Sequence, residues 1–185
     1  MRVSVKKAVL MAAIVVMPMV FNGCGSKKEQ VMKEFKSADG NVSIMLDENW
    51  EQEDVGQEGA EGFIVAGSSD GTEGGFVFQV GKEYADSLDS VKEIEESAYG
   101  ITDKKAVDAP EISGISIKDA YTCKIHSGDG EDEVDGDGYV LYGESDQAYY
   151  AIIFVAEKMT DNKQASYAKS CTTLKVQDTA EDTAE

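Results

Sequence analysis

A run of nine apolar residues, 148–156, constrains the fold more than any other part of this sequence. Its β-branched and aromatic side chains favour a strand, and the run is apolar at both odd and even positions. A strand of this kind is stable only where other layers cover it on both sides. The run therefore predicts a central strand in a sheet that carries packing layers on both faces.

The first half of the sequence predicts two β-hairpins. In residues 35–46, Val42, Ile44 and Leu46 alternate with other residues after an Asp-Gly turn, which indicates a hairpin with one buried face. Residues 62–80 contain two apolar runs around a polar, glycine-containing tip, which indicates a second hairpin. The acidic residues between the two hairpins, 51–61, are predicted to form a loop.

Two segments carry helix signals. Ser87 can cap a helix over residues 88–99, and Gly100 can end it. Thr160 can cap a second helix that runs to Cys171. The first helix has four apolar positions that are predicted to share one buried face: Leu88, Val91, Ile94 and Ala98.

Further strands are predicted at residues 112–125, 137–142 and 174–176. The order of elements thus combines a mostly antiparallel sheet with two helices that can cover its faces. This order predicts an α+β fold, an antiparallel sheet covered by helices in an α/β/α sandwich.

The first 23 residues predict an export signal. Three basic residues precede an uninterrupted apolar stretch, residues 8–21, and Gly23 then stands before Cys24. This order is typical of bacterial lipoprotein signals, in which the cysteine is acylated. The apolar stretch is shorter than the roughly 20 residues that span a bilayer. We therefore expect cleavage between Gly23 and Cys24, and a lipid on Cys24 that holds the chain at the extracytoplasmic face of the cell membrane.

Phe21 and Asn22 depart from the small residues usual before such a cysteine, so an uncleaved anchor or an ordinary secretory signal is the alternative. The predicted organisation is a signal over residues 1–23, a polar tether over 24–33, and one domain over 34–177. An acidic tail over 178–185 repeats Asp-Thr-Ala-Glu and is predicted to be disordered.

The charge of the sequence limits its partners. It contains 36 Asp and Glu against 17 Lys and Arg, a net charge of −19. The predicted leader holds three of the basic residues and none of the acidic ones, so the remainder has a net charge near −22. Such a surface repels nucleic acids and anionic lipid head groups. The expected partners are the membrane, through the lipid on Cys24, and a protein or small molecule.

Two cysteines remain after the predicted lipidation site. Cys123 and Cys171 could form a disulfide outside the cytoplasm, or both could be buried thiols. Their spacing matches no metal motif, so no metal ligands are predicted.

Residues 35–46, closed by Trp50, resemble the opening of the PsbP-like family. The end of the sequence is also similar to that family: a long aromatic and aliphatic strand, a helix and a short apolar strand. The resemblance covers residues 35–176, and bacterial lipoproteins are among the proteins of this pattern. It implies an antiparallel sheet between helices, and a role in binding or assembly without catalysis.

The sequence offers little for catalysis. His126 is the only histidine, and no serine stands in a nucleophile-elbow motif. Cys123 and His126 would lie on opposite faces of one strand, which argues against a Cys-His pair. No catalytic residue, cofactor or metal site is therefore predicted.

Two further clusters have ordinary interpretations. Residues 129–137 contain six carboxylates. When the EF-hand pattern is aligned with them, Tyr142 falls at the position that needs a bidentate glutamate. A solvated loop is therefore predicted rather than a strong calcium site. Several aromatic residues could line a groove or pack in the core. These are Trp50, Tyr99, Tyr121, Tyr139, Tyr142, Tyr149 and Tyr150.

Two functions of different class fit these observations. The first is a lipid-anchored, extracytoplasmic binding or assembly module that is not an enzyme. The alternative is a cell-envelope hydrolase that uses a pair of carboxylates. A paired, desolvated carboxylate in a cleft would favour the hydrolase, whereas a shallow apolar patch would favour the binding module.

Overall fold

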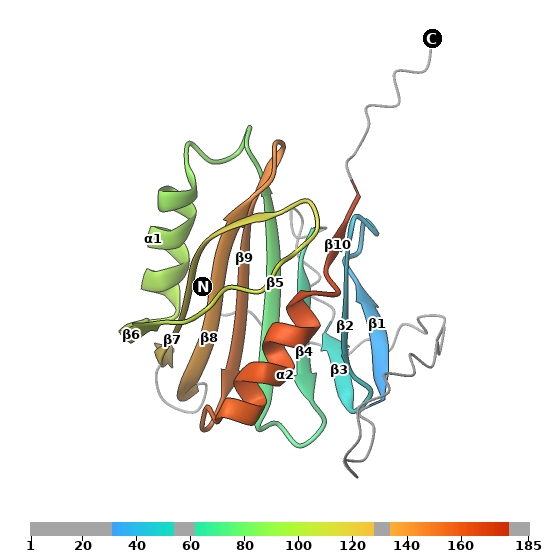
Figure 1. Ribbon diagram of the computed structural model, residues 1–185, viewed down its shortest axis with the longest axis vertical. Coiled ribbons are helices and arrows are strands. Elements are labelled where there is room, and N and C mark those ends of the chain that lie inside the picture. The colour runs from blue at the N-terminus through green and yellow to red at the C-terminus, as the bar shows by residue number, and fades with distance from the viewer. Residues whose placement is uncertain (1–30, 54–61, 128–133, 178–185) are drawn as a thin grey trace.

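The computed structural model describes residues 31–53, 62–127 and 134–177. Within these ranges the chain forms ten strands and two helices (Figure 1). In chain order they are β1 (Met32–Lys36), β2 (Val42–Asp47), β3 (Trp50–Glu53), β4 (Ile64–Ser68), β5 (Glu73–Gly81), α1 (Leu88–Ala98), β6 (Thr102–Ala106), β7 (Ser116–Ser127), β8 (Val134–Glu144), β9 (Ala148–Ala156), α2 (Asp161–Cys171) and β10 (Lys175–Val176).

The strands form two antiparallel sheets. The larger sheet has seven strands in the order β3-β4-β5-β9-β8-β7-β6, and the smaller has three in the order β1-β2-β10. β9 therefore occupies the middle position of the larger sheet, and all nine of its residues are buried. The prediction of a central strand at residues 148–156 is confirmed.

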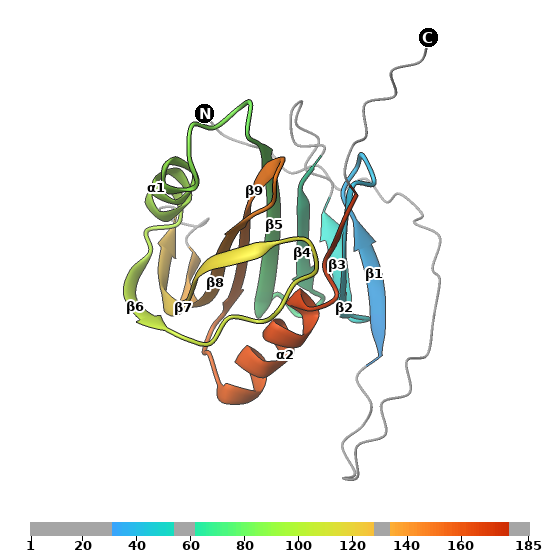
Figure 2. The same ribbon diagram turned by 45° about the horizontal axis from the view of Figure 1, so that its top comes forward.

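The two faces of the larger sheet carry different layers. α2 and the three-stranded sheet lie on one face, and α1 lies on the other (Figures 1 and 2). Alternate residues of β9 pack on opposite faces of the sheet. Ile152 and Phe154 belong to the core on the α2 face, and Ile153 and Val155 belong to the core on the α1 face. The fold is mostly antiparallel sheet with two helices. The predicted sandwich has helices alone as the covering layers, whereas in the structure a second sheet also covers the α2 face.

Both helices begin at the predicted caps. The Ser87 hydroxyl accepts a hydrogen bond from the Ser90 amide at 3.2 Å, and Thr160 accepts one from the Lys163 amide at 3.3 Å. α1 ends before Gly100, which has a φ of +53°. A Cβ atom at this position would lie 2.0 Å from the carbonyl oxygen of His126. Only glycine therefore allows the chain to turn this closely against β7.

The predicted apolar face of α1 is only partly correct. Val91 is buried, but the side chain of Ile94 is 66% exposed and Ala98 is also exposed. Glu95, one turn after Val91, is half-buried instead. The helix is turned with Lys92 toward β7, where Lys92 forms an ion pair with Asp119 at 2.7 Å.

The strand boundaries differ from the predictions at several places. β7 spans residues 116–127 where 112–125 was predicted, and β8 spans residues 134–144 where 137–142 was predicted. Glu51–Glu53, predicted to lie in a loop, pair with β4 as part of β3. β1 includes Met32 and Lys33, which were assigned to the tether. β6 was not predicted, because its residues are polar and all exposed at the edge of the sheet.

The predicted signal, Cys24, most of the tether and the acidic tail lie outside the described residues. None of the helices within the described part of the chain is long and apolar enough to cross a membrane.

Candidate functional site

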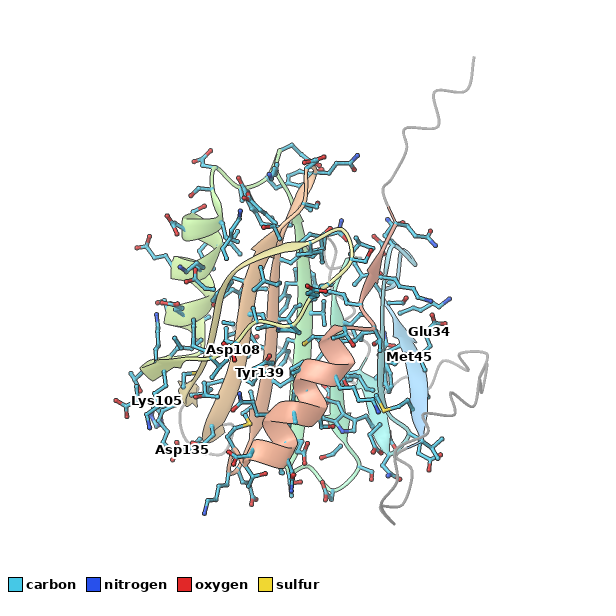
Figure 3. The ribbon with its side chains drawn as sticks, in the orientation of Figure 1. Glu34, Met45, Lys105, Asp108, Asp135 and Tyr139 are labelled. Atoms are coloured by element: carbon cyan, nitrogen blue, oxygen red, sulfur yellow. The ribbon has the colours of Figure 1, made fainter. Side chains whose placement is uncertain are left out.

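A cavity of about 570 Å³ lies on the α2 face, where the β6–β7–β8 edge of the sheet meets the first turn of α2. We call it the edge cavity. Figure 3 shows Lys105 at this edge and Tyr139 farther into the sheet. The cavity is lined by Asp103, Lys104, Lys105, Thr122, Cys123, Lys124, Asp137, Met159, Thr160, Asp161 and Gln164.

Half of the charged groups that line the edge cavity are paired: Lys104, Lys124 and Asp137. The Lys124 ammonium donates to Asp137 at 2.5 Å, and the second carboxylate oxygen of Asp137 accepts from the Met159 amide at 2.8 Å. The hydrogen bond from Lys124 is the main cause that lowers the pKa of Asp137 below its usual value, and the hydrogen bond from Met159 lowers it further. Burial opposes this shift. An acid with a lowered pKa remains ionised at neutral pH, so it is poorly suited to donate a proton.

The outer wall of the edge cavity contains an irregular strand. The pairing of β6 with β7 shifts register between Thr102 and Lys105, and Asp103 has a φ of +52°. Bulges of this kind redirect side chains at a sheet edge. Lys104 pairs with Glu96 of α1, and the next residue, Lys105, lines the edge cavity.

A second cavity, of about 340 Å³, lies between the turns of β2–β3 and β4–β5 and the exposed side of α2. We call it the turn cavity. Its carboxylates are also satisfied. Asp70 accepts from the Ser68 hydroxyl at 2.7 Å and from Thr72, and these hydrogen bonds lower its pKa to about 2. Glu73 accepts from Tyr167 at 2.5 Å and forms an ion pair with Lys163 at 2.8 Å.

A polar network fastens α1 to the sheet. The Tyr121 hydroxyl donates to Glu96 at 2.7 Å, and Lys104 donates to the other carboxylate oxygen of Glu96. Burial would raise the pKa of Glu96, but the hydrogen bonds from Lys104 and Tyr121 outweigh it and lower that pKa. Together with the pair between Lys92 and Asp119, this network fixes one flank of α1 against β6 and β7.

The other side of α1 borders a row of aromatic rings. The Phe63 and Phe78 rings lie 4.7 Å apart, Phe78 and Phe76 lie 6.0 Å apart, and Phe76 and Tyr99 lie 5.3 Å apart. We call these four residues the aromatic strip. Phe78 is only 8% exposed, but Phe63, Phe76 and Tyr99 are half-buried, as is the neighbouring Val65.

The position of α1 explains why the strip is partly exposed. α1 packs over β8 and β9, and among the described elements it is the helix on this face (Figure 2). No helix of the described part of the chain covers the β3–β4–β5 half of the same face, where Phe63, Val65 and Phe76 are partly exposed. Register places Val65 beside Phe76, so the two strands form one continuous apolar surface.

Glu95 lies at the border between α1 and this surface, one helical turn before Tyr99 of the strip. It is half-buried, and its carboxylate has no hydrogen-bond or ion-pair partner among the residues that the structure describes. Burial raises the pKa of Glu95 above its usual value. A charge that is partly removed from water without a partner is costly, so this border is where a ligand with the opposite charge would gain most.

The structure separates the two cysteines. Cys123 belongs to the core on the α1 face and Cys171 to the core on the α2 face, and both are buried free thiols. The disulfide alternative is wrong because the sheet lies between the two side chains. Burial raises the pKa of both thiols, that of Cys123 to about 11, so neither is a ready nucleophile at neutral pH.

The other predicted site residues are dispersed. His126 is exposed at the end of β7. Most of the predicted aromatic residues are buried, and Tyr99 alone of that set belongs to the aromatic strip. Phe63 and Phe76 were not singled out, because their contact depends on the pairing of β4 with β5.

Part of the acidic cluster, residues 129–133, lies outside the described residues, whereas Asp135 and Asp137 belong to β8. In the described part of the chain no group of three or more His, Cys, Asp or Glu residues is placed to hold a metal ion. The predicted loop is wrong at Asp135 and Asp137, which pair within the sheet, and the expectation that the cluster is no strong calcium site stays a prediction.

Comparison with known proteins found similarity to solved structures but not to known sequences. No family model matches the sequence, and no curated protein matches it significantly. The chain is similar to the solution structure of cyanobacterial PsbP (CyanoP) from Synechocystis sp. PCC 6803, with 11% identity and a TM-score of 0.47. The match covers 84% of this chain and 98% of that chain. At this identity the similarity says nothing about ligands or partners.

Proposed function

We propose that this chain is a lipid-anchored binding or assembly module at the extracytoplasmic face of the cell membrane, and that it binds a protein partner through the aromatic strip. The observation that carries the proposal is the continuous, partly exposed row of Phe63, Phe78, Phe76 and Tyr99. Contiguous apolar patches on a surface are typical of interaction sites, and aromatic side chains are enriched at the centres of interfaces. The anchor at Cys24 supplies the location.

The carboxylates of the two cavities favour binding over hydrolysis. A hydrolase of the alternative type needs one carboxyl group with a raised pKa to act as a general acid. In the edge cavity the pKa of Asp137 is lowered by Lys124, and in the turn cavity the pKa of Asp70 is lowered to about 2. The half-buried carboxyl group with a raised pKa, Glu95, borders the aromatic strip instead.

The proposal includes the finer description of the fold. We take the domain to be a PsbP-like α/β/α sandwich, on the strength of residues 35–46, Trp50 and the closing strand-helix-strand pattern. The hairpin of β1 and β2, the central strand β9 and the order β9-α2-β10 agree with those residues.

Site-specific crosslinking tests the proposal in the anchored protein. A photo-reactive amino acid at Ile94, which is exposed on α1, the helix that ends at Tyr99 of the aromatic strip, should form a discrete protein adduct in the protein's own membranes. Ala165 is the matched control, because it is exposed on α2 at the opposite side of the sheet. The same adduct from Ala165, or none from Ile94, would contradict the assignment of the partner surface to the α1 face.

A further inference from the structure

Acidic side chains border the aromatic strip along β3. In β3, Trp50 is buried on the α2 face, so alternation places Glu51 and Glu53 on the α1 face. Register sets Glu53 beside Val65 and Glu51 beside Gly67 of β4. Both glutamates are exposed. The outer border of the apolar surface is therefore negative.

One flank of α1 adds exposed apolar side chains to the face of the sheet that carries the aromatic strip. Successive residues of a helix are rotated by about 100°, so Ile94 and Ala98 share a flank away from Lys92 and Glu96. Ile94 and Ala98 are both exposed, whereas Lys92 and Glu96 are paired with residues of β7 and β6. A segment that lies on the aromatic strip can therefore also contact apolar side chains of the helix.

Glu95 adds a negative charge on the helix side of the strip. It precedes Tyr99 by four residues, and side chains at this spacing are neighbours on a helix surface. Burial is the main cause that raises the pKa of the Tyr99 hydroxyl, and the negative charge of Glu95 raises it further. This second effect agrees with a short separation between the Tyr99 hydroxyl and the Glu95 carboxylate. Lys92 of α1 and Lys104 of β6 are held by their ion pairs with Asp119 and Glu96.

From these positions we infer that the segment docked on the aromatic strip is basic: a partner segment with apolar side chains against the four rings and with lysine or arginine beside Glu95. The inference rests on the proposed function, because it names the chemistry of the partner that the strip binds. A cation would give Glu95 the partner that it lacks within the described domain, and charge-assisted hydrogen bonds are stronger than neutral ones.

The same charges disfavour the other occupants of such a surface. A second copy of this chain would bring Glu51, Glu53 and Glu95 against an equally acidic surface, and like charges across an interface are repulsive. An anionic membrane surface would be repelled for the same reason.

Binding of two model peptides tests this inference. The full chain is anchored in phosphatidylcholine vesicles and carries the photo-reactive residue at position 94. It is exposed either to a short labelled amphipathic peptide of leucine and lysine, or to the corresponding peptide of leucine and glutamate. We expect adducts with the lysine peptide only. Glu95→Gln should weaken its capture about tenfold, which corresponds to the loss of one charge-assisted contact of about 1.4 kcal/mol. Glu93→Gln, an exposed neighbour on the outer side of α1, should leave capture within about twofold.

The outcomes separate this inference from the proposed function. Equal capture of both peptides, or capture unchanged by Glu95→Gln, would overturn the basic partner and leave the strip as a docking surface. Adducts of Ile94 only with lipid or with a second copy of the chain would overturn both. A melting temperature of Glu95→Gln no lower than that of the parent establishes that weaker capture does not come from unfolding.

Discussion

The rings of Phe76 and Tyr99 lie 5.3 Å apart and join the middle of the larger sheet to the end of α1. Phe76 belongs to β5, and Tyr99 is the residue that caps the C-terminus of α1. Their contact places the helix end beside the β3–β4–β5 half of the α1 face. The aromatic strip is therefore held by both elements, and a change that moves the end of α1 should also disturb the strip.

We expect Gly100→Ala to destabilise the domain. Its Cβ atom would lie 2.0 Å from the His126 carbonyl oxygen, and the φ of +53° adds strain for any residue with a side chain. The cost should exceed about 2 kcal/mol in the free energy of unfolding, measured by chemical denaturation. Gly40→Ala is the control: its φ is +75°, but nothing lies within 4 Å of the added atom, so only the backbone strain of about 1 kcal/mol remains. Equal losses for the two variants would contradict the close-contact explanation.

Ile153→Asp should unfold the domain. Ile153 is fully buried in β9, and an unpaired charge there has no compensating partner. We expect a loss of more than about 4 kcal/mol, enough to remove the cooperative melting transition seen by circular dichroism. Ile94→Asp makes the same chemical change at a side chain that is 66% exposed, and it should melt like the parent. A cooperative transition retained by Ile153→Asp would contradict the central position of β9.

The stability contributed at Glu95 should depend on pH in a defined direction. Burial raises the pKa of Glu95, so the folded state binds its proton more tightly than the unfolded state does, and stability falls as pH rises. The fall should begin near pH 4, around the unfolded value for glutamate, and should be complete above the raised folded value. Glu95→Gln should therefore melt higher than the parent at pH 7 and equal to it below about pH 4. The control Glu93→Gln should melt like the parent at both pH values. A melting temperature of Glu95→Gln below that of the parent at pH 7 would contradict this prediction, because it would mean that Glu95 has a stabilising partner.

The proposed lipid anchor gives a separate prediction. Acylation requires the sulfur of Cys24, so Cys24→Ser should release the chain from the membrane or leave its signal unprocessed. Ser26→Ala, two residues later, should remain in the membrane fraction. Metabolic labelling with a radioactive fatty acid measures the modification directly, and undiminished label in Cys24→Ser would show that the lipid is attached elsewhere.

Local patterns in the sequence predict much of the fold. The apolar run 148–156 identifies β9 as a central strand, and Ser87 and Thr160 identify the starts of both helices, because burial and capping depend on neighbouring residues. β6 has no such pattern, since all of its residues are exposed at a sheet edge where no alternation of apolar residues is needed.

The aromatic strip could not be predicted in the same way. The exposure of Ile94 depends on how Lys92 and Glu96 turn α1 toward β7, and the contact between Phe76 and Tyr99 depends on where α1 lies over the sheet. These are relations between elements far apart in the sequence. Aromatic residues in strands are also most often core residues, as Tyr139 and Tyr142 are here.

The most direct test of the aromatic strip as the partner surface combines the substitution Val65→Lys with the photo-reactive residue at position 94. The quantity measured is the yield of the protein adduct formed from position 94 in the protein's own membranes. Val65 lies beside Phe76, so a lysine there would place a charge on the apolar surface and would repel a basic partner. We predict at least a tenfold loss of the adduct, about 1.4 kcal/mol of binding free energy, with no loss for Thr172→Lys at an exposed position after α2. An adduct of equal yield in a folded Val65→Lys chain would contradict the account.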